Sequence, residues 1–345
     1  MWVARGFGTG YTTCMLNKSI ALLVAPLLVS APLENSIELG FEGGTSFLRT
    51  IESKGELVLE FAMVVNDEEQ DMGAEPIDLA YSETQKFRDT IQSLGDGRPT
   101  KIERTHEELI VERTIETPEE TIEEELTSPL TGEVAIFTWS DEDSEWSVAQ
   151  PEDAETELEE DILNDLRPDL DLLGLLPDGE VSVDDEWDVG GELYHCLSWP
   201  GGIMTYLFEE QEERDELEAD LSRQRYDNVE ATGKAKLVSV EDGVATIEVK
   251  LEATTEAEVE IEVEEAEEGP TPEVSRTQEA ETELEITITW DLEAGHWTSV
   301  SMSDTTTMQI DESAKFDMEG EEFTMVQSRS FEGEIQIEWT NEVVK

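Results

Sequence analysis

The chain has 345 residues, of which 87 are Asp or Glu and 21 are Lys or Arg, so its formal net charge is −66 at pH 7. This charge argues strongly against nucleic-acid binding, because a phosphate backbone is bound by Lys and Arg, and it disfavours an anionic membrane surface. It favours a solvated surface, diffuse binding of divalent cations, or a basic protein partner. The length is sufficient for one large or two ordinary domains.

Residues 15–31 have the layout of a secretory signal peptide. Lys18 supplies a positive region, residues 20–29 form an apolar core, and small residues ending at Ala31 give a cleavage pattern. The segment is short for a membrane span. We therefore expect export to the periplasm, the cell envelope or the medium, with no integral membrane segment after cleavage. Only Cys196 would then remain, which excludes an intrachain disulfide.

Changes in composition divide the chain into four parts. We assign residues 1–31 to the signal peptide, 32–150 to an N-terminal strand-rich lobe, 151–180 to a helical connection, and 181–345 to a C-terminal antiparallel β-meander.

The N-terminal lobe begins with strand patterns at residues 47–52 and 57–65. Residues of both parities are apolar in the second, which predicts a central strand covered on both faces. Residues 77–94 predict a helix, because four apolar side chains recur at helical spacing and a glycine follows. Further strands are predicted at residues 101–117 and 133–140.

The middle of the chain is predicted to be partly helical. Leucines and isoleucines at helical spacing predict a helix over residues 158–166, which Pro168 ends. Residues 193–208 are rich in aromatic side chains and predict a strand, whereas the highly charged residues 209–226 predict a surface helix.

The C-terminal part shows the clearest alternation. In residues 282–302, apolar side chains alternate with Glu and Thr before a turn at residues 291–295. This pattern predicts a hairpin with one buried apolar face and one solvent-exposed polar face. The same alternation recurs at 258–264 and 334–340. The fold class is therefore α+β, with mostly antiparallel β-meander sheets and a few helices packed on one face.

Two segments carry a resemblance to a known group. Residues 175–187 (LLPDGEVSVDDEW) resemble a turn that precedes a β-meander in uncharacterised exported bacterial proteins, although Asp184 stands where that group has Gly. Residues 233–302 are similar to it in style, with their Asp242-Gly243 turn. The resemblance implies an exported bacterial β-rich domain and no catalytic residues.

Candidate binding residues are few. Tryptophans near predicted strand ends could form an apolar or carbohydrate-binding face, with core packing as the alternative. Clustered carboxylates could bind calcium, with a solvated acidic surface as the alternative, because neither cluster has EF-hand spacing. The candidates for a ligand are Trp187, Trp199, Trp297 and His296, and those for a metal are Asp141, Asp143, Asp184 and Asp185.

No catalytic residue is predicted. His195 and Cys196 would point to opposite faces of the predicted strand, so they would not form a dyad with each other. The sequence contains no HExxH, GxSxG or Walker A pattern. We therefore expect no dedicated cofactor.

These patterns favour an exported, non-catalytic binding or envelope-associated protein, whose concave sheet would hold an apolar or lipid-like ligand. Two alternatives remain open. One is a secreted hydrolase that uses carboxylates, and the other is a structural interaction module with a basic partner.

The signal peptide gives a direct prediction. The exported chain should begin after Ala31, which N-terminal sequencing of the secreted protein would show. The uncleaved precursor would reveal by the same method whether translation starts at Met15 rather than Met1. An exported chain that retains residues 20–29 would contradict the prediction.

Overall fold

The computed structural model describes residues 35–40, 42–66, 68–70, 75–95, 98–118, 120–142, 144–168, 170–208, 215–261, 272–318 and 321–344. The predicted signal peptide lies outside these residues. Glu34–Lys345 form one compact unit. No helix in the described ranges has the length and apolar character that a membrane span requires.

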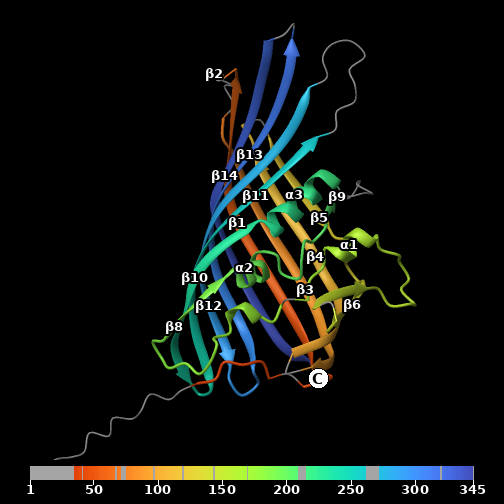
Figure 1. Ribbon diagram of the computed structural model, residues 1–345, viewed down its shortest axis with the longest axis vertical. Coiled ribbons are helices and arrows are strands. Elements are labelled where there is room, and N and C mark those ends of the chain that lie inside the picture. Colours follow the sequence, from red (N-terminus) through yellow and green to blue (C-terminus); the bar gives the residue numbers. More distant parts are fainter. Residues whose placement is uncertain are drawn as a thin grey trace, which may run out of the picture. The chain divides into compact units, whose positions relative to one another are not determined.

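Fourteen antiparallel strands form one sheet (Figure 1). They are β1 (Ser46–Val65), β2 (Glu68–Gln70), β3 (Ile77–Gly95), β4 (Arg98–Glu116), β5 (Thr121–Thr127), β6 (Val134–Ser140), β7 (Glu145–Ala149), β8 (Glu186–Gly190), β9 (Leu207–Phe208), β10 (Val229–Glu241), β11 (Val244–Ile261), β12 (Glu273–Asp291), β13 (His296–Met318) and β14 (Glu321–Val344).

The strand order is that of a meander whose first and last long strands are joined. It runs β7-β6-β4-β3-β1-β14-β13-β12-β11-β10-β8, with β2, β5 and β9 paired off this path. β1 pairs with β14 over its whole length, from Ser46 opposite Val344 to Val65 opposite Met325. The strands of both predicted lobes therefore lie in one sheet, which stays open between β7 and β8.

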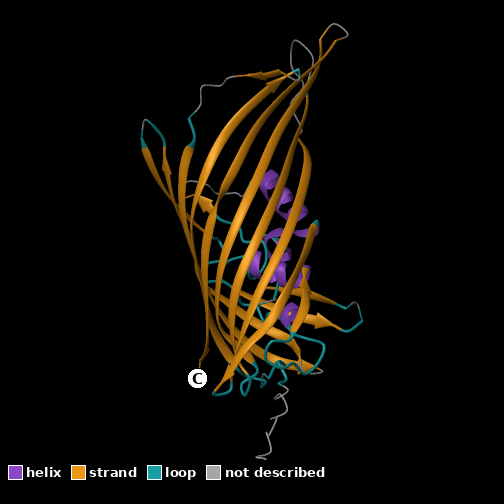
Figure 2. Ribbon diagram, turned by 90° about the vertical axis from the view of Figure 1, so that its left-hand side faces the viewer, coloured by secondary structure: helices purple, strands orange, loops and turns teal. Residues whose placement is uncertain are grey.

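The helices and their connecting loops lie on one face of this sheet, which we call the inner face (Figure 2). They are α1 (Glu160–Asn164), the 3-10 helix η1 (Leu173–Leu175), α2 (Gly191–Ser198) and α3 (Glu216–Asp227). Asp215 caps α3, because its side chain accepts hydrogen bonds from the backbone N–H groups of Leu217 and Glu218. The predicted antiparallel sheet with a few helices on one face is confirmed.

Two predicted elements are wrong. Residues 77–94 form strand β3 and not a helix, because the apolar spacing also fits period two, and pairing with β1 and β4 on both sides decides between the two. Residues 193–208 contain α2 and only the short strand β9. The helix buries Leu193, Tyr194 and Leu197 on one side, and this spacing is helical.

Two other helix predictions are confirmed over part of their length. The predicted helix at residues 158–166 is α1, and that at residues 209–226 is α3. Residues 209–214 lie outside the described ranges.

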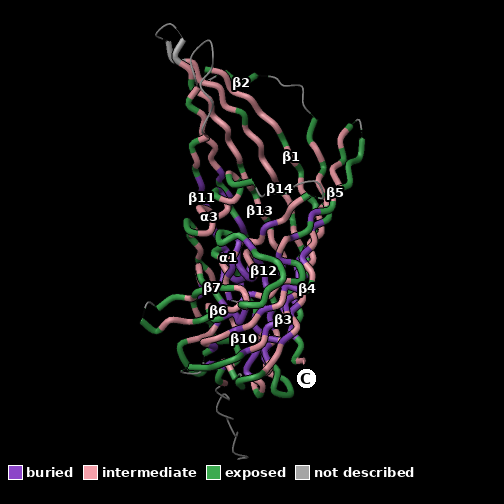
Figure 3. The backbone as a smooth tube through the Cα atoms, turned by 90° about the vertical axis from the view of Figure 1, so that its right-hand side faces the viewer, coloured by how far each residue is buried: buried purple, intermediate pink, exposed green. Residues whose placement is uncertain are grey.

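The core lies between the inner face and the helices. The predicted hairpin of residues 282–302 is formed by β12 and β13. Its inner row is almost completely buried, with at most 3% exposure at Leu284, Ile286, Ile288 and Trp290. Figure 3 shows the buried residues gathered in the half of the sheet that carries the helices, which we call the proximal half.

A network of four charged side chains is buried inside this core. Asp89 of β3 accepts hydrogen bonds from Arg49 Nη1 at 3.0 Å and from Arg104 Nε at 2.7 Å. Arg49 also pairs with Asp171, and Arg104 Nη1 donates to the backbone oxygen of Arg167 at 2.7 Å. Burial opposes the ionisation of Asp89, but the two guanidinium groups outweigh it and lower the pKa of this carboxyl. The network holds the loop against the sheet at Arg167 and Asp171.

This network gives a stability prediction. Asp89→Asn removes the negative charge between two buried guanidinium groups, so the free energy of unfolding should fall by about 3–5 kcal/mol. Urea unfolding measures the change. The matched control is Glu285→Gln, which breaks the exposed pair with Lys250 and should leave the unfolding midpoint unchanged. An Asp89→Asn protein as stable as the parent would contradict the account.

Candidate functional site

The inner face stays apolar beyond the helices. We call this part the distal half, formed by residues 57–65 of β1, 77–81 of β3, 305–316 of β13 and 323–335 of β14. On β1, every second side chain continues the row that begins with the buried Phe47 and Ile51. The distal members of that row are all half-buried, namely Leu57, Leu59, Phe61, Met63 and Val65.

Neighbouring strands extend this apolar surface sideways. Leu59 lies opposite Ile77 of β3 and Phe331 of β14, and Phe331 in turn lies opposite Met308 of β13. The side chains placed on the same face by this register are also half-buried, and they are Ile77, Leu79, Met308, Ile310, Ala314, Phe316, Met325 and Phe331.

The outer face of the same strands is different in character. Its exposed side chains include Glu60 of β1, Glu332 and Glu334 of β14, and Glu279 and Glu281 of β12. The apolar-in, acidic-out alternation therefore continues where the filled core has ended. A half-exposed apolar surface of this extent is typical of a binding face.

The prediction that residues 57–65 form a strand covered on both faces is wrong in one respect. The strand is central in the sheet, but its distal half is half-exposed on the inner face, and Val58 on the outer face is 40% exposed. Apolar residues of both parities made the two faces look alike in the sequence. The register with β3 and β14 distinguishes them.

Helix α3 borders the distal inner face along β11. Arg225 Nε donates to Thr255 Oγ1 at 3.4 Å, and Asn228 Nδ2 donates to the backbone oxygen of Glu256 at 3.2 Å. Gln224 Oε1 accepts a hydrogen bond from the backbone N–H of Glu258 at 3.0 Å. The amide side chains of α3 thus satisfy backbone groups along this edge of β11.

Two arginines on the distal inner face, Arg276 and Arg329, are paired with carboxylates. Glu312 lies 3.1 Å from Arg276 Nη2 and 3.7 Å from Arg329 Nη2, and Arg276 Nη1 reaches Glu218 of α3 at 2.5 Å. These pairs neutralise the charge next to the apolar side chains.

A polar band separates the filled core from the distal inner face. Tyr206 Oη donates to Glu83 Oε1 at 2.6 Å, and Gln85 Nε2 donates to the same oxygen at 2.7 Å. Thr306 Oγ1 donates to Asp304 Oδ1 at 2.6 Å. Burial raises the pKa of Asp304 to about 6, against the partial compensation of the Thr306 hydrogen bond.

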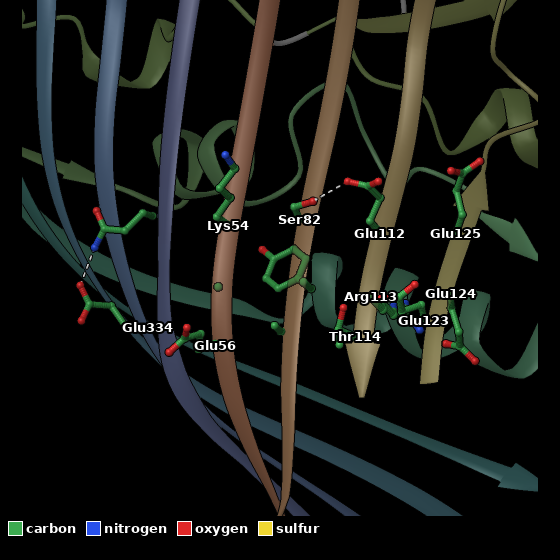
Figure 4. A pocket seen from close by; sticks show the side chains of 14 residues that line it. Lys54, Glu56, Ser82, Glu112, Arg113, Thr114, Glu123, Glu124, Glu125 and Glu334 are labelled. Atoms are coloured by element: carbon green, nitrogen blue, oxygen red, sulfur yellow. Dashed lines mark hydrogen bonds between the residues drawn. The ribbon is translucent and has the colours of Figure 1, made fainter. Parts of the chain in front are cut away.

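A surface hollow of 1090 Å³ lies across β14, β1, β3, β4 and β5 (Figure 4). It is lined largely by outer-face side chains, among them Glu56, Glu112 and Glu334. Ser82 Oγ donates to Glu112 Oε2 at 3.1 Å. Such a lining is typical of a solvated acidic surface rather than a ligand site.

The four predicted ligand-binding residues lie on three separate elements. Trp297 is 1% exposed and its Nε1 donates to the backbone oxygen of Leu170 at 2.8 Å, while His296 packs edge-to-face on Phe47. Trp187 of β8 donates to the backbone oxygen of Leu175 at 2.7 Å. Trp199 follows α2 and packs against Tyr194 and Tyr226. The structure brings only His296 and Trp297 together, in the core.

The predicted metal ligands make hydrogen bonds and ion pairs of their own. Asp141 Oδ1 accepts from Trp139 Nε1 at 3.0 Å, Asp184 pairs with Lys236 at 2.8 Å, and Asp185 Oδ2 accepts from the Ser182 N–H at 2.7 Å. Asp143 lies outside the described residues. Within the described part of the chain, no group of three or more His, Cys, Asp or Glu side chains is arranged to hold a metal ion. Cation binding at these positions stays a prediction.

The comparisons with known proteins assign no family. No family model matches the chain, and no curated protein matches it. Among solved structures, a mutant of the Rh. blastica porin is 10% identical and covers 85% of this chain and 100% of its own, with a TM-score of 0.13. OpdQ of Pseudomonas aeruginosa is 7% identical, covers 87% and 98%, and also has a TM-score of 0.13. Likeness at these TM-scores carries no argument about this chain.

The polar band gives a pH prediction. The folded pKa of Asp304 exceeds its ordinary value of 3.8, so the folded state holds the proton more tightly than the unfolded state. Relative to Asp304→Asn, the parent should therefore lose stability as the pH rises from about 4 to about 7. Urea unfolding at several pH values measures this difference.

The matched control for the pH series is Asp311→Asn, because Asp311 lies on the outer face of β13, the strand that also carries Asp304. A constant stability difference between the parent and Asp304→Asn across the pH range would contradict the prediction.

Proposed function

We propose that this chain is an exported, non-catalytic binding protein that holds an apolar or lipid-like ligand against the distal inner face. The observation that carries the proposal is the half-exposed apolar row from Leu57 to Val65, which continues the core row past the end of the helical cover. The flanking strands contribute side chains of the same kind on the same face.

The energetics favour such a ligand. Removing apolar surface from water contributes about 25 cal/mol per Å², and this sum is reduced by the entropy that a bound ligand loses. A flexible hydrocarbon chain laid along β1 would cover several half-exposed side chains at once. The acidic outer face would keep the loaded protein dissolved.

The carboxylates of the inner face support a hydrolase less well. A general acid and base need to converge on one substrate atom with separated pKa values. Asp304 has a raised pKa, but Glu83 already accepts hydrogen bonds from Tyr206 and Gln85. The exported, non-catalytic proposal agrees with the predicted signal peptide and with the group that the sequence resembles.

A paired substitution on β1 tests the proposal. Leu59→Asn places an amide on the inner face, and it should weaken binding of a fluorescent, uncharged long-chain lipid by about tenfold, because the apolar surface of one leucine is lost. The control is Val58→Asn, which places the same amide on the outer face one residue away, where Val58 is 40% exposed. This control should leave the dissociation constant unchanged.

Native mass spectrometry of protein taken from its source would identify a ligand that is carried through purification. Equal effects of the two β1 substitutions, or no binding of the uncharged lipid by the parent, would contradict the proposal.

A further inference from the structure

A separate cavity of 850 Å³ lies at the opposite, proximal end of the inner face. Described residues from three parts of the chain line it: the end of β3 with the start of β4, the strands β6 and β7 with Asp141, and the loop residues Arg167, Pro168, Asp171 and Leu173. Its volume is in the range of small-molecule sites, which is about 300–1,000 Å³. None of the distal inner-face residues line it, so it is independent of the proposed apolar site.

Two tryptophans form one wall of this cavity. Trp139 of β6 and Trp146 of β7 are cross-strand partners, with ring centroids 5.7 Å apart and an interplanar angle of 63°. Both indoles are half-buried. Trp139 Nε1 donates a hydrogen bond to Asp141 Oδ1 at 3.0 Å. The two indoles together form an aromatic surface on this side of the cavity.

The rest of the lining combines an apolar base with donors and acceptors. Ile102 is 2% exposed and Leu173 is 40% exposed. Arg98 supplies hydrogen-bond donors, Thr100 supplies a hydroxyl, and Asp141 supplies carboxylate oxygens. Asp171 contributes little free charge to the wall, because it pairs with Arg49.

The charge of the site favours a neutral ligand. Asp141 and the formal net charge of −66 disfavour an anion. Arg98 in the lining disfavours a cation. A neutral ring with apolar C–H faces and several hydroxyls matches both parts of the lining, because its faces can cover the indoles while its hydroxyls both donate and accept.

From this geometry we infer that the cavity at Trp139 and Trp146 binds a neutral saccharide unit, either free or at the end of a longer glycan. The indoles cover the C–H face of the sugar ring, and Arg98 and Asp141 bind its hydroxyls.

Isothermal titration calorimetry and tryptophan fluorescence on the full exported chain test the inference. The panel contains neutral hexoses, short neutral oligosaccharides, a uronic acid and an amino sugar. We expect binding of a neutral member, weaker binding of both charged members, and a fluorescence change. Tighter binding of oligosaccharides than of hexoses would indicate a glycan end, and equal binding would indicate a free sugar.

Substitutions locate the binding to this cavity. Trp146→Ala should weaken the neutral sugar by about tenfold or more, because it removes one aromatic wall. Trp146→Phe should restore part of the affinity. The control is Ser147→Ala, on the opposite face of β7, whose hydroxyl donates to the backbone oxygen of Thr138. If Trp146→Ala fails to fold, Arg98→Gln at the exposed start of β4 gives the second readout, and it should also weaken binding of the neutral sugar.

Three results would overturn the inference. They are no binding of any neutral saccharide at millimolar concentration, tighter binding of a charged sugar, and equal weakening by Trp146→Ala and Ser147→Ala. An uncharged long-chain lipid that binds normally alongside any of these results would leave the distal proposal intact, because the two sites share no residues.

Discussion

The pairing of β1 with β14 is the constraint on which the rest of the structure depends. It joins the first and last long strands from Ser46 opposite Val344 to Val65 opposite Met325. Without it, there would be two separate sheets, one of β1 to β7 with β9 and the other of β8 with β10 to β14. Contacts between distant parts of a chain slow folding, because a long loop has to close before they form. The concave inner face exists only once this pairing is made.

The two halves of the inner face differ in how their apolar rows are covered. In the proximal half, α1, α2 and the loops cover the apolar rows, and the Arg49–Asp89–Arg104–Asp171 network fastens residues 167–171 to the strands. In the distal half, the same alternation is left half-exposed. One sequence pattern thus serves both stability and, in our proposal, ligand binding. What differs between the halves is whether a helix covers the row.

The sequence predicted the fold class and the hairpin of β12 and β13, because strict alternation of Leu284 to Trp290 with polar residues fits only a strand. It did not predict β3, whose apolar residues fit two periods, or α2, whose aromatic residues suggested a strand. The buried network of Arg49, Asp89, Arg104 and Asp171 could not be predicted from the sequence, for a physical reason. Asp89 and Asp171 are two acids among 87, and only long-range pairing shows which acids are buried.

The same reason limited prediction of the candidate sites. The distal face depends on register between β1, β3 and β14, which lie far apart in the sequence. Trp139 and Trp146 form a cavity wall only because a distant part of the chain, including Arg167, Asp171 and Leu173, lines the same cavity. His296 and Trp297 seemed to flank a binding turn, yet they are buried by packing against Phe47 and residue 170.

The contacts of α3 with β11 have a consequence for the behaviour of the protein in concentrated solution. An open sheet presents strand edges on which a second molecule could add a strand, and this is a common route to aggregation. β10 pairs with β11 only as far as Thr255, and beyond it Asn228 and Gln224 occupy the backbone groups of Glu256 and Glu258. The C-terminal end of α3 therefore blocks this edge of β11 against the addition of a further strand. The neighbouring glutamates repel an approaching second molecule of the protein.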